Sequence, residues 1–210
     1  MNLNKYDTII LDCDGVVFDS NLLKIKAFEK TLLELNYDKL KVEKFTEYFK
    51  NNFGVSRYRL VEYFLSDILK VGFDELIYNK ILDKYSKKSF ELYKNADLTK
   101  DLINFLEFYK DKNFYIASGS KEKELKEIFK IRKIDKYFKA IYGSPKKKSE
   151  IIKDIVKNHP NSVMIGDAMS DMIAAKEAKI DFIFMRDYST NEELKNKDDL
   201  VTISNLGDLI

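Results

Sequence analysis

The stretch Thr8-Ile9-Ile10-Leu11-Asp12-Cys13-Asp14-Gly15 runs from an apolar segment directly into two aspartates and a glycine. Its continuous hydrophobicity predicts a strand that is buried on both faces, as in a parallel sheet. Because residues two apart on a strand point the same way, Asp12 and Asp14 should project together from its carboxyl end. Gly15 permits a sharp change of chain direction there. A plain Asp-Gly turn with incidental carboxylates is the simpler alternative for this stretch alone.

Four more short apolar runs follow, at residues 114–117, 140–142, 163–165 and 182–185, and they alternate with helical patterns at 99–111, 121–130, 148–158 and 170–178. This alternation predicts an α/β fold with a doubly wound parallel sheet and right-handed crossovers. Residues 21–94 break it, because their apolar residues, such as Ile25, Phe28 and Leu32, recur at helical spacing and no strand pattern occurs among them. We therefore predict a core of residues 1–20 and 95–210, with an all-helical insertion at 21–94.

A second acidic element, Gly166-Asp167-Ala168-Met169-Ser170-Asp171, follows the predicted strand at 163–165. A starting helix places Asp167 and Asp171 on one face, although N-capping would account for one of them. Ligands of doubly wound sheets bind at the carboxyl ends of the strands, where these residues should meet Asp12 and Asp14. Four converging carboxylates need a counter-charge, and a hard divalent cation supplies it. We expect Mg²⁺, which Mn²⁺ could replace.

Hydroxyl and amine groups follow the other predicted strands. Ser118 and Gly119 precede a helix whose free N–H groups favour an anion, and Lys148 opens the next helix. Taken singly, a serine there is more often a helix cap and a lysine in a lysine run is more often solvated. Lys146 and Lys147 are alternatives to Lys148 as the anion-binding lysine.

The composition narrows the classes of function. The chain has 210 residues and a formal net charge of +2, and its longest basic run is three lysines, so nucleic acid is not an expected partner. No apolar stretch reaches the ~20 residues that cross a bilayer, and the N-terminus lacks a signal-peptide core. The single cysteine, Cys13, fits a reducing compartment and a buried apolar role, and the only histidine, His159, precedes a proline, which argues against a histidine base. We expect a cytoplasmic protein, a monomer or a homodimer, without membrane partners.

The order of these motifs resembles the haloacid dehalogenase (HAD) superfamily over essentially the whole chain, and residues 21–94 resemble its helical cap of the first type. The resemblance implies a Rossmann-like core and a phosphatase that acts on a small phosphorylated metabolite. It implies Asp12 as the nucleophile and Asp14 as the general acid/base, with Ser118, Gly119 and Lys148 holding the phosphoryl group. Asp12, Asp167 and the Asp14 carbonyl would bind Mg²⁺, and Asp171 would either bind it through water or orient Lys148. Aspartate at position 14 favours a phosphatase or phosphomutase over dehalogenases, phosphonate-cleaving enzymes and transport ATPases.

The substrate is expected to be a sugar phosphate or a phosphoglycolate-like acid, with a phosphomutase of the β-phosphoglucomutase type as the alternative. The turn Gly54-Val55-Ser56-Arg57 is a candidate loop over the site. Arg57 would either bind a second anionic group of the substrate or lie on the surface. Two other classes are less consistent with the pattern. A phospho-receiver would carry its aspartate on a mid-chain strand, and a silent binding protein would lack some of these groups.

Overall fold

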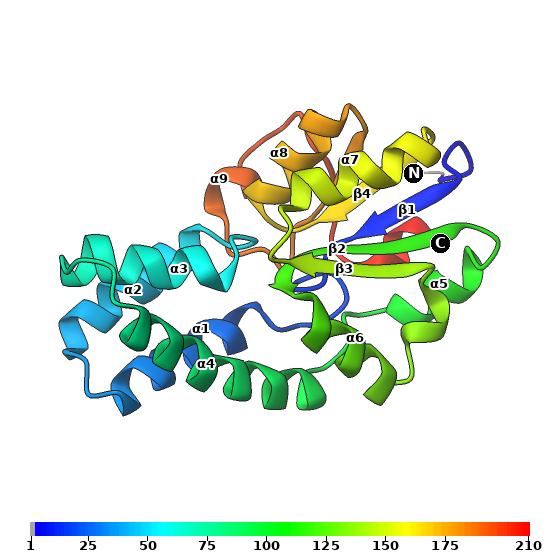
Figure 1. Cartoon of the computed structure of the whole chain (residues 1–210). Coiled ribbons are helices and arrows are strands. Elements are labelled where there is room, and N and C mark those ends of the chain that lie inside the picture. Colours follow the sequence, from blue (N-terminus) through cyan, green and yellow to red (C-terminus); the bar gives the residue numbers. More distant parts are fainter. Residues whose placement is uncertain (1–2) are drawn as a thin grey trace.

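The computed structural model describes residues 3–210 and contains a six-stranded sheet of order β3-β2-β1-β4-β5-β6 (Figure 1). Every neighbouring pair of strands is parallel. The strands are β1 (Thr8–Leu11), β2 (Asn113–Lys121), β3 (Ala140–Ser144), β4 (Ser162–Gly166), β5 (Asp181–Met185) and β6 (Val201–Ile203). The sheet confirms the doubly wound α/β prediction. β6 was not predicted, because its three residues include exposed Val201 and Thr202 and so carry little apolar signal.

Helices cover both faces of the sheet. One face packs against α5 (Leu102–Phe108), α6 (Glu122–Ile131) and the 3₁₀ turn η3 (Leu206–Leu209), and it includes Ile9 and Leu11. The opposite face, which includes Ile10, packs against α7 (Lys148–Asn158) and α8 (Met169–Ala178). Alternate residues of β1 thus serve two cores, which is why its sequence is apolar throughout. The short 3₁₀ turn η2 (Asp135–Tyr137) and helix α9 (Glu192–Lys195) complete the connections.

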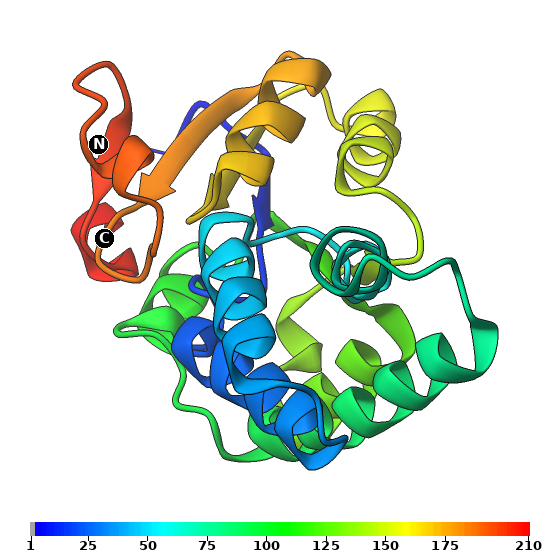
Figure 2. The same ribbon diagram turned by 90° about the vertical axis from the view of Figure 1, so that its left-hand side faces the viewer.

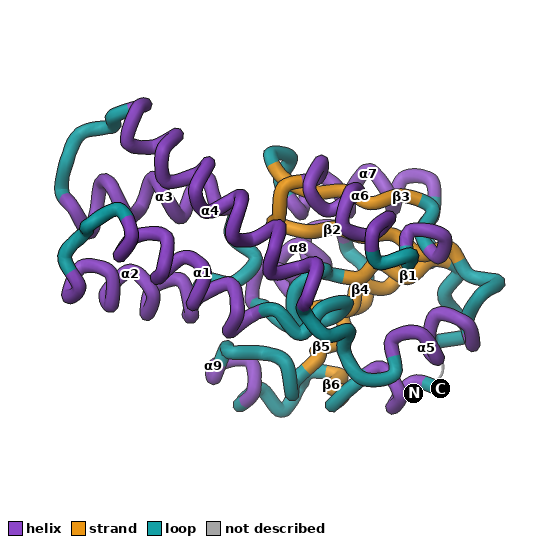
Figure 3. Tube along the Cα trace, turned by 90° about the horizontal axis from the view of Figure 1, so that it is seen from below, coloured by secondary structure: helices purple, strands orange, loops and turns teal. Residues whose placement is uncertain are grey.

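Between β1 and α5 the elements are all helical: α1 (Asn21–Glu34), α2 (Lys39–Asn51), α3 (Arg57–Tyr63), the π-helical turn η1 (Phe64–Leu69) and α4 (Glu75–Asn95). We call this segment, residues 21–95, the helical layer. It has its own buried cluster, built around stacked and tilted rings such as Phe28, Phe45 and Tyr85. Figure 1 shows the layer projecting beyond the carboxyl ends of the strands, and Figure 2 views the molecule from the side of this layer. Figure 3 shows α4 running from the far end of the layer back to the sheet. Among residues 3–210, no helix combines the length and the apolar character that crossing a membrane requires.

Candidate active site

Three buried aspartates gather at the carboxyl edge of the sheet. Asp12 follows β1, Asp167 follows β4, and Asp171 lies in the first turn of α8. One carboxylate oxygen of each lies within 4.8 Å of those of the other two. The exposed fractions of Asp12 and Asp167 are 3% and 2%, and Asp171 is fully buried. Gly15, with φ of +74°, allows the chain to turn close to Asp167, whose carboxylate lies 2.5 Å from where a Cβ would stand.

Lys148, the first residue of α7, reaches two of these carboxylates. Its Nζ lies 2.9 Å from Asp12 Oδ1 and donates a short hydrogen bond to Asp171 Oδ1. Both aspartates raise the pKa of Lys148 against the opposing effect of burial, so the amine stays charged. Of the other two lysines considered, Lys146 pairs with Asp154 at the surface, 2.5 Å away, and Lys147 is exposed. The buried lysine is therefore Lys148.

Asp171 has both of its oxygens engaged. Besides the bond from Lys148 to Oδ1, its Oδ2 accepts backbone N–H groups of Asp167 and Ala168 at 3.2 and 3.0 Å. Asp167 in turn accepts a hydrogen bond from Asn21 of α1 at 2.5 Å. Burial, the first cause, and the neighbouring carboxylates raise the pKa of Asp167 well above its usual value. Burial also raises the pKa of Asp12 to about 7, although Lys148 opposes this.

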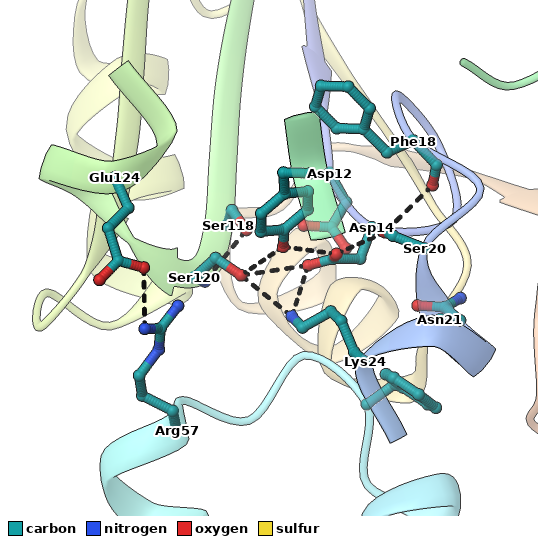
Figure 4. Close-up of polar contacts among 12 residues, drawn as sticks. Asp12, Asp14, Phe18, Ser20, Asn21, Lys24, Arg57, Ser118, Ser120 and Glu124 are labelled. Atoms are coloured by element: carbon teal, nitrogen blue, oxygen red, sulfur yellow. Dashed lines mark hydrogen bonds and ion pairs between the residues drawn. The ribbon is translucent and has the colours of Figure 1, made fainter. Parts of the chain in front are cut away.

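Asp14 lies in a separate network of donors (Figure 4). Its Oδ1 accepts hydrogen bonds from Ser20 and Tyr93, both at 2.6 Å, and its Oδ2 accepts from Lys24 at 2.7 Å and Ser120 at 3.2 Å. Burial works to raise the pKa of Asp14, but Lys24 and these hydrogen bonds outweigh it and lower that pKa. The helical layer thus supplies two of the donors, Lys24 from α1 and Tyr93 from the last turn of α4.

The sequence interpretation missed Lys24, Tyr93, Ser120 and Asn21. One signal was available for Lys24, which stands four residues before Phe28 and so shares the apolar face of α1. A lysine on that face indicates a buried partner. Tyr93, Ser120 and Asn21 carry no comparable signal, because their roles depend on how α4 and α1 dock onto β2 and β4.

Ser118 and Gly119 lie in the last part of β2. Ser118 stands two residues beyond the register pair Leu11–Ile116, so it reaches the same sheet edge as Asp12, and its Oγ accepts the Ser120 N–H at 3.1 Å. A Cβ on Gly119 would stand 2.5 Å from the Gly54 carbonyl oxygen. The turn that contains Gly54 therefore sits directly on β2, and the Ser170 hydroxyl holds it further through the Phe53 carbonyl at 3.1 Å.

A cavity of about 560 Å³ opens between this turn and the ends of α7 and α8. Its lining includes Gly54, Tyr58, Gly119, Lys148 and Ser170, and Asp12 is not among its lining residues. Arg57 does not line this cavity. It is 4% exposed and forms an ion pair with Glu124 of α6 at 2.8 Å, which contradicts the alternative of a surface arginine.

The acidic cluster fits a divalent cation. Three carboxylates face one ammonium, Lys148, which leaves two negative charges unbalanced when all are ionised. Asp12 Oδ1 is buried and, among the residues that the structure describes, accepts no hydrogen bond beyond its ion pair. Hard carboxylate oxygens of this kind suit Mg²⁺.

The comparisons place the chain among known proteins. The sequence profile of the family described as haloacid dehalogenase-like hydrolase matches residues 9–185. No curated protein sequence matches the chain. The fold is similar to that of a phosphoglycolate phosphatase, described as predicted, from Haemophilus somnus, with a TM-score of 0.79 and 15% identity over 98% of this chain and 96% of that one.

Two other solved structures are similar. β-Phosphoglucomutase from Clostridium difficile gives a TM-score of 0.77 at 21% identity and covers 98% of this chain and 93% of its own. A phosphatase, also described as predicted, from Clostridium acetobutylicum gives 0.74 at 21% identity, with coverage of 97% and 95%. At these identities the likeness concerns the fold.

The contact between Gly54 and Gly119 is open to a direct test. Gly119→Ala should lower kcat/KM roughly 10- to 100-fold, because the new methyl group collides with backbone of the turn and displaces it from the sheet edge. Gly72→Ala is the matched control, since a Cβ there meets no atom within 4 Å. Steady-state kinetics of both variants, beside their melting temperatures, measure the effect. Equal activity of the two variants would show that the turn need not seat on Gly119.

Proposed function

The chain belongs to the haloacid dehalogenase-like hydrolases, and we propose that it is a Mg²⁺-dependent phosphatase of a small phosphate monoester. The observation that carries this proposal is the meeting of Asp12, Lys148, Asp167 and Asp171 at one buried sheet edge. An aspartate beside a buried lysine can act as a nucleophile, because the lysine binds the negatively charged oxygens of the group that is attacked.

In the proposed reaction Asp12 attacks phosphorus, the bond from phosphorus to the leaving oxygen breaks, and an aspartyl-phosphate forms. Asp14, which its donors hold as a carboxylate in this structure, first takes up a proton from the phosphate monoester monoanion and passes it to the leaving oxygen. It then accepts a proton from water, which attacks the aspartyl-phosphate and releases inorganic phosphate. Lys148, Ser118 and the Gly119 N–H bind the phosphoryl oxygens.

Mg²⁺ would be held by Asp12, Asp167 and the Asp14 backbone carbonyl, and it would neutralise the charge between the nucleophile and the anionic substrate. For Asp171 we propose the orienting role, because its oxygens already accept from Lys148 and from two backbone N–H groups. Its replacement would therefore act through the position of Lys148.

We further propose residues 1–20 and 95–210 as the core and residues 21–94 as a cap that covers the nucleophile and excludes water. Its separate hydrophobic cluster supports this division. Arg57, at the start of α3, would contact the part of the substrate that leaves, since its Nη2 is buried without a hydrogen-bond partner in residues 3–210.

Phosphate release from a panel of phosphorylated metabolites tests the proposal. With Mg²⁺ present, release from at least one monoester should exceed that in EDTA by more than about 100-fold, because the cluster then lacks its counter-charge. Re-adding Mg²⁺ should restore the rate, and Mn²⁺ should partly replace it. Release that EDTA leaves unchanged would contradict a metal-dependent mechanism.

A phosphomutase remains the second candidate, since the likeness to β-phosphoglucomutase is as close as that to the phosphatases. A mutase passes the phosphoryl group to a second hydroxyl and excludes water from the phosphoenzyme. Activity that requires a sugar bisphosphate primer, without a matching release of phosphate, would identify it.

A further inference from the structure

The positive charge of Arg57 is balanced by a carboxylate of the protein itself. Its Nη1 lies 2.8 Å from Glu124 Oε2 and donates a hydrogen bond to Ser86 Oγ, also at 2.8 Å. The Tyr85 ring packs 5.1 Å from the guanidinium carbon. Figure 4 shows Arg57 entering from the helical layer and Glu124 facing it from the sheet side, next to the Ser120–Lys24–Asp14 network. The ion pair thus joins α3 to α6 beside the site.

One nitrogen of Arg57 nevertheless lacks a hydrogen-bond acceptor. Its Nη2 is buried and has no hydrogen-bond partner among the described residues. Guanidinium N–H groups that are buried without an acceptor cost free energy, so an oxygen atom is expected there when substrate is bound. One donor edge is therefore free, while the positive charge is already balanced.

The other buried cations near Asp12 and Asp14 are also paired. Lys24 is bound to Asp14 at 2.7 Å, and Lys148 to Asp12 and Asp171. Lys121 lies 3.5 Å from Glu124 Oε1, but its side chain is 41% exposed and its charge is therefore largely screened by solvent. A second anionic group on the substrate would find no buried unpaired cation among these residues.

We propose that Glu124 determines substrate specificity by occupying the charge of Arg57, so that the leaving group presents an uncharged hydroxyl or carbonyl oxygen to Arg57 Nη2. This inference rests on the proposed phosphatase function and narrows its substrate to a polyol or sugar monophosphate. A carboxylate or second phosphate at the same place would lie against Glu124, and repulsion between like charges is strong where water is excluded.

Two matched substrate pairs test the inference. Glycerol 1-phosphate differs from 3-phosphoglycerate, and glucose 6-phosphate from glucose 1,6-bisphosphate, mainly by the second anionic group. The wild-type protein should favour the uncharged member by about tenfold or more, a factor typical of one misplaced charge. The ratio is measured as kcat/KM where turnover occurs, and as the ratio of dissociation constants for the Asp12→Asn variant where it does not.

Glu124→Gln keeps the shape of the side chain and removes its charge, and it should shift the ratio toward the anionic member by about tenfold. Glu127→Gln is the matched control, because it makes the same change on an exposed residue of α6 and should leave the ratio unaltered. Adding Arg57→Ala to Glu124→Gln should remove the gain, since the freed cation is then absent.

A wild-type preference for the anionic members would overturn the inference, and so would equal ratios in the two glutamine variants. If Glu124→Gln does not fold, the wild-type ratios still decide. Absence of phosphate release from all monoesters would instead count against the proposed function, and the binding ratios would still report on Glu124.

Discussion

Replacing Asp12 by asparagine is expected to lower phosphate release by at least about 10⁴-fold in kcat, because an amide cannot form the phosphoenzyme. The fold should survive the change. Asp12 is buried, and its pKa is raised to about 7 mainly by burial, so a neutral group of the same shape removes a charge that the site holds at some cost. The melting temperature without added metal should therefore stay level or rise.

The measurement is single-turnover phosphate release with Mg²⁺, beside thermal unfolding in EDTA. Asp19→Asn is the matched control, since Asp19 stands seven residues further along in an exposed position. Loss of activity in Asp12→Asn alone, together with loss of the phosphoenzyme that acid quenching traps in the wild type, would support the nucleophile assignment. Substantial release by Asp12→Asn would point to a different nucleophile or to direct attack by water.

Replacing Lys148 by methionine is expected to lower kcat roughly 10²- to 10³-fold, the range for losing one donor to a developing oxyanion. It should also reduce the free energy of unfolding by about 3 kcal/mol, because Asp12 and Asp171 then lie buried without their shared cation. The two losses have the same origin, a lysine with an exposed fraction of only 8%.

Lys147→Met is the control for Lys148→Met, because it makes the same chemical change at the neighbouring residue, whose side chain is exposed. Chemical denaturation and steady-state kinetics of the pair separate the two residues. If Lys147→Met were the more damaging variant, the anion-binding lysine would have been misassigned. If Lys148→Met lost stability but kept full activity, the lysine would serve only to balance charge.

The fold was predictable because its signals are local. Five strands contain continuous apolar runs, and helix α7 begins and ends where its pattern does, at Lys148 and Asn158. The helix expected over residues 99–111 is shorter, Leu102–Phe108, since Asp101 adopts a left-handed conformation with φ of 61° and the helix can start only after it. Helix ends of this kind depend on the dihedral angles of single residues, which the hydrophobic periodicity of the sequence does not reveal.

The candidate site likewise contains residues that could be predicted from local patterns and residues that could not. Asp12, Ser118, Lys148 and Asp167 lie at or just after strand ends, and the parallel sheet brings strand ends together whatever the rest of the chain does. Lys24, Tyr93 and Glu124 lie on helices, and their partners are 10, 79 and 67 positions away in the sequence. Such pairs follow from the docking of the helical layer, which short-range patterns do not contain.

The near-complete burial of the proposed nucleophile has a consequence for substrate entry. With Asp12 and Asp14 only 3% and 7% exposed, the proposed reaction requires α1 and the turn before α3 to separate from the sheet edge. Such an opening would break the Arg57–Glu124 ion pair and the hydrogen bonds from Ser170 to Phe53 and from Thr190 to Lys50. We therefore expect the frequency of this movement, on the microsecond-to-millisecond scale of domain motions, to set an upper limit on turnover.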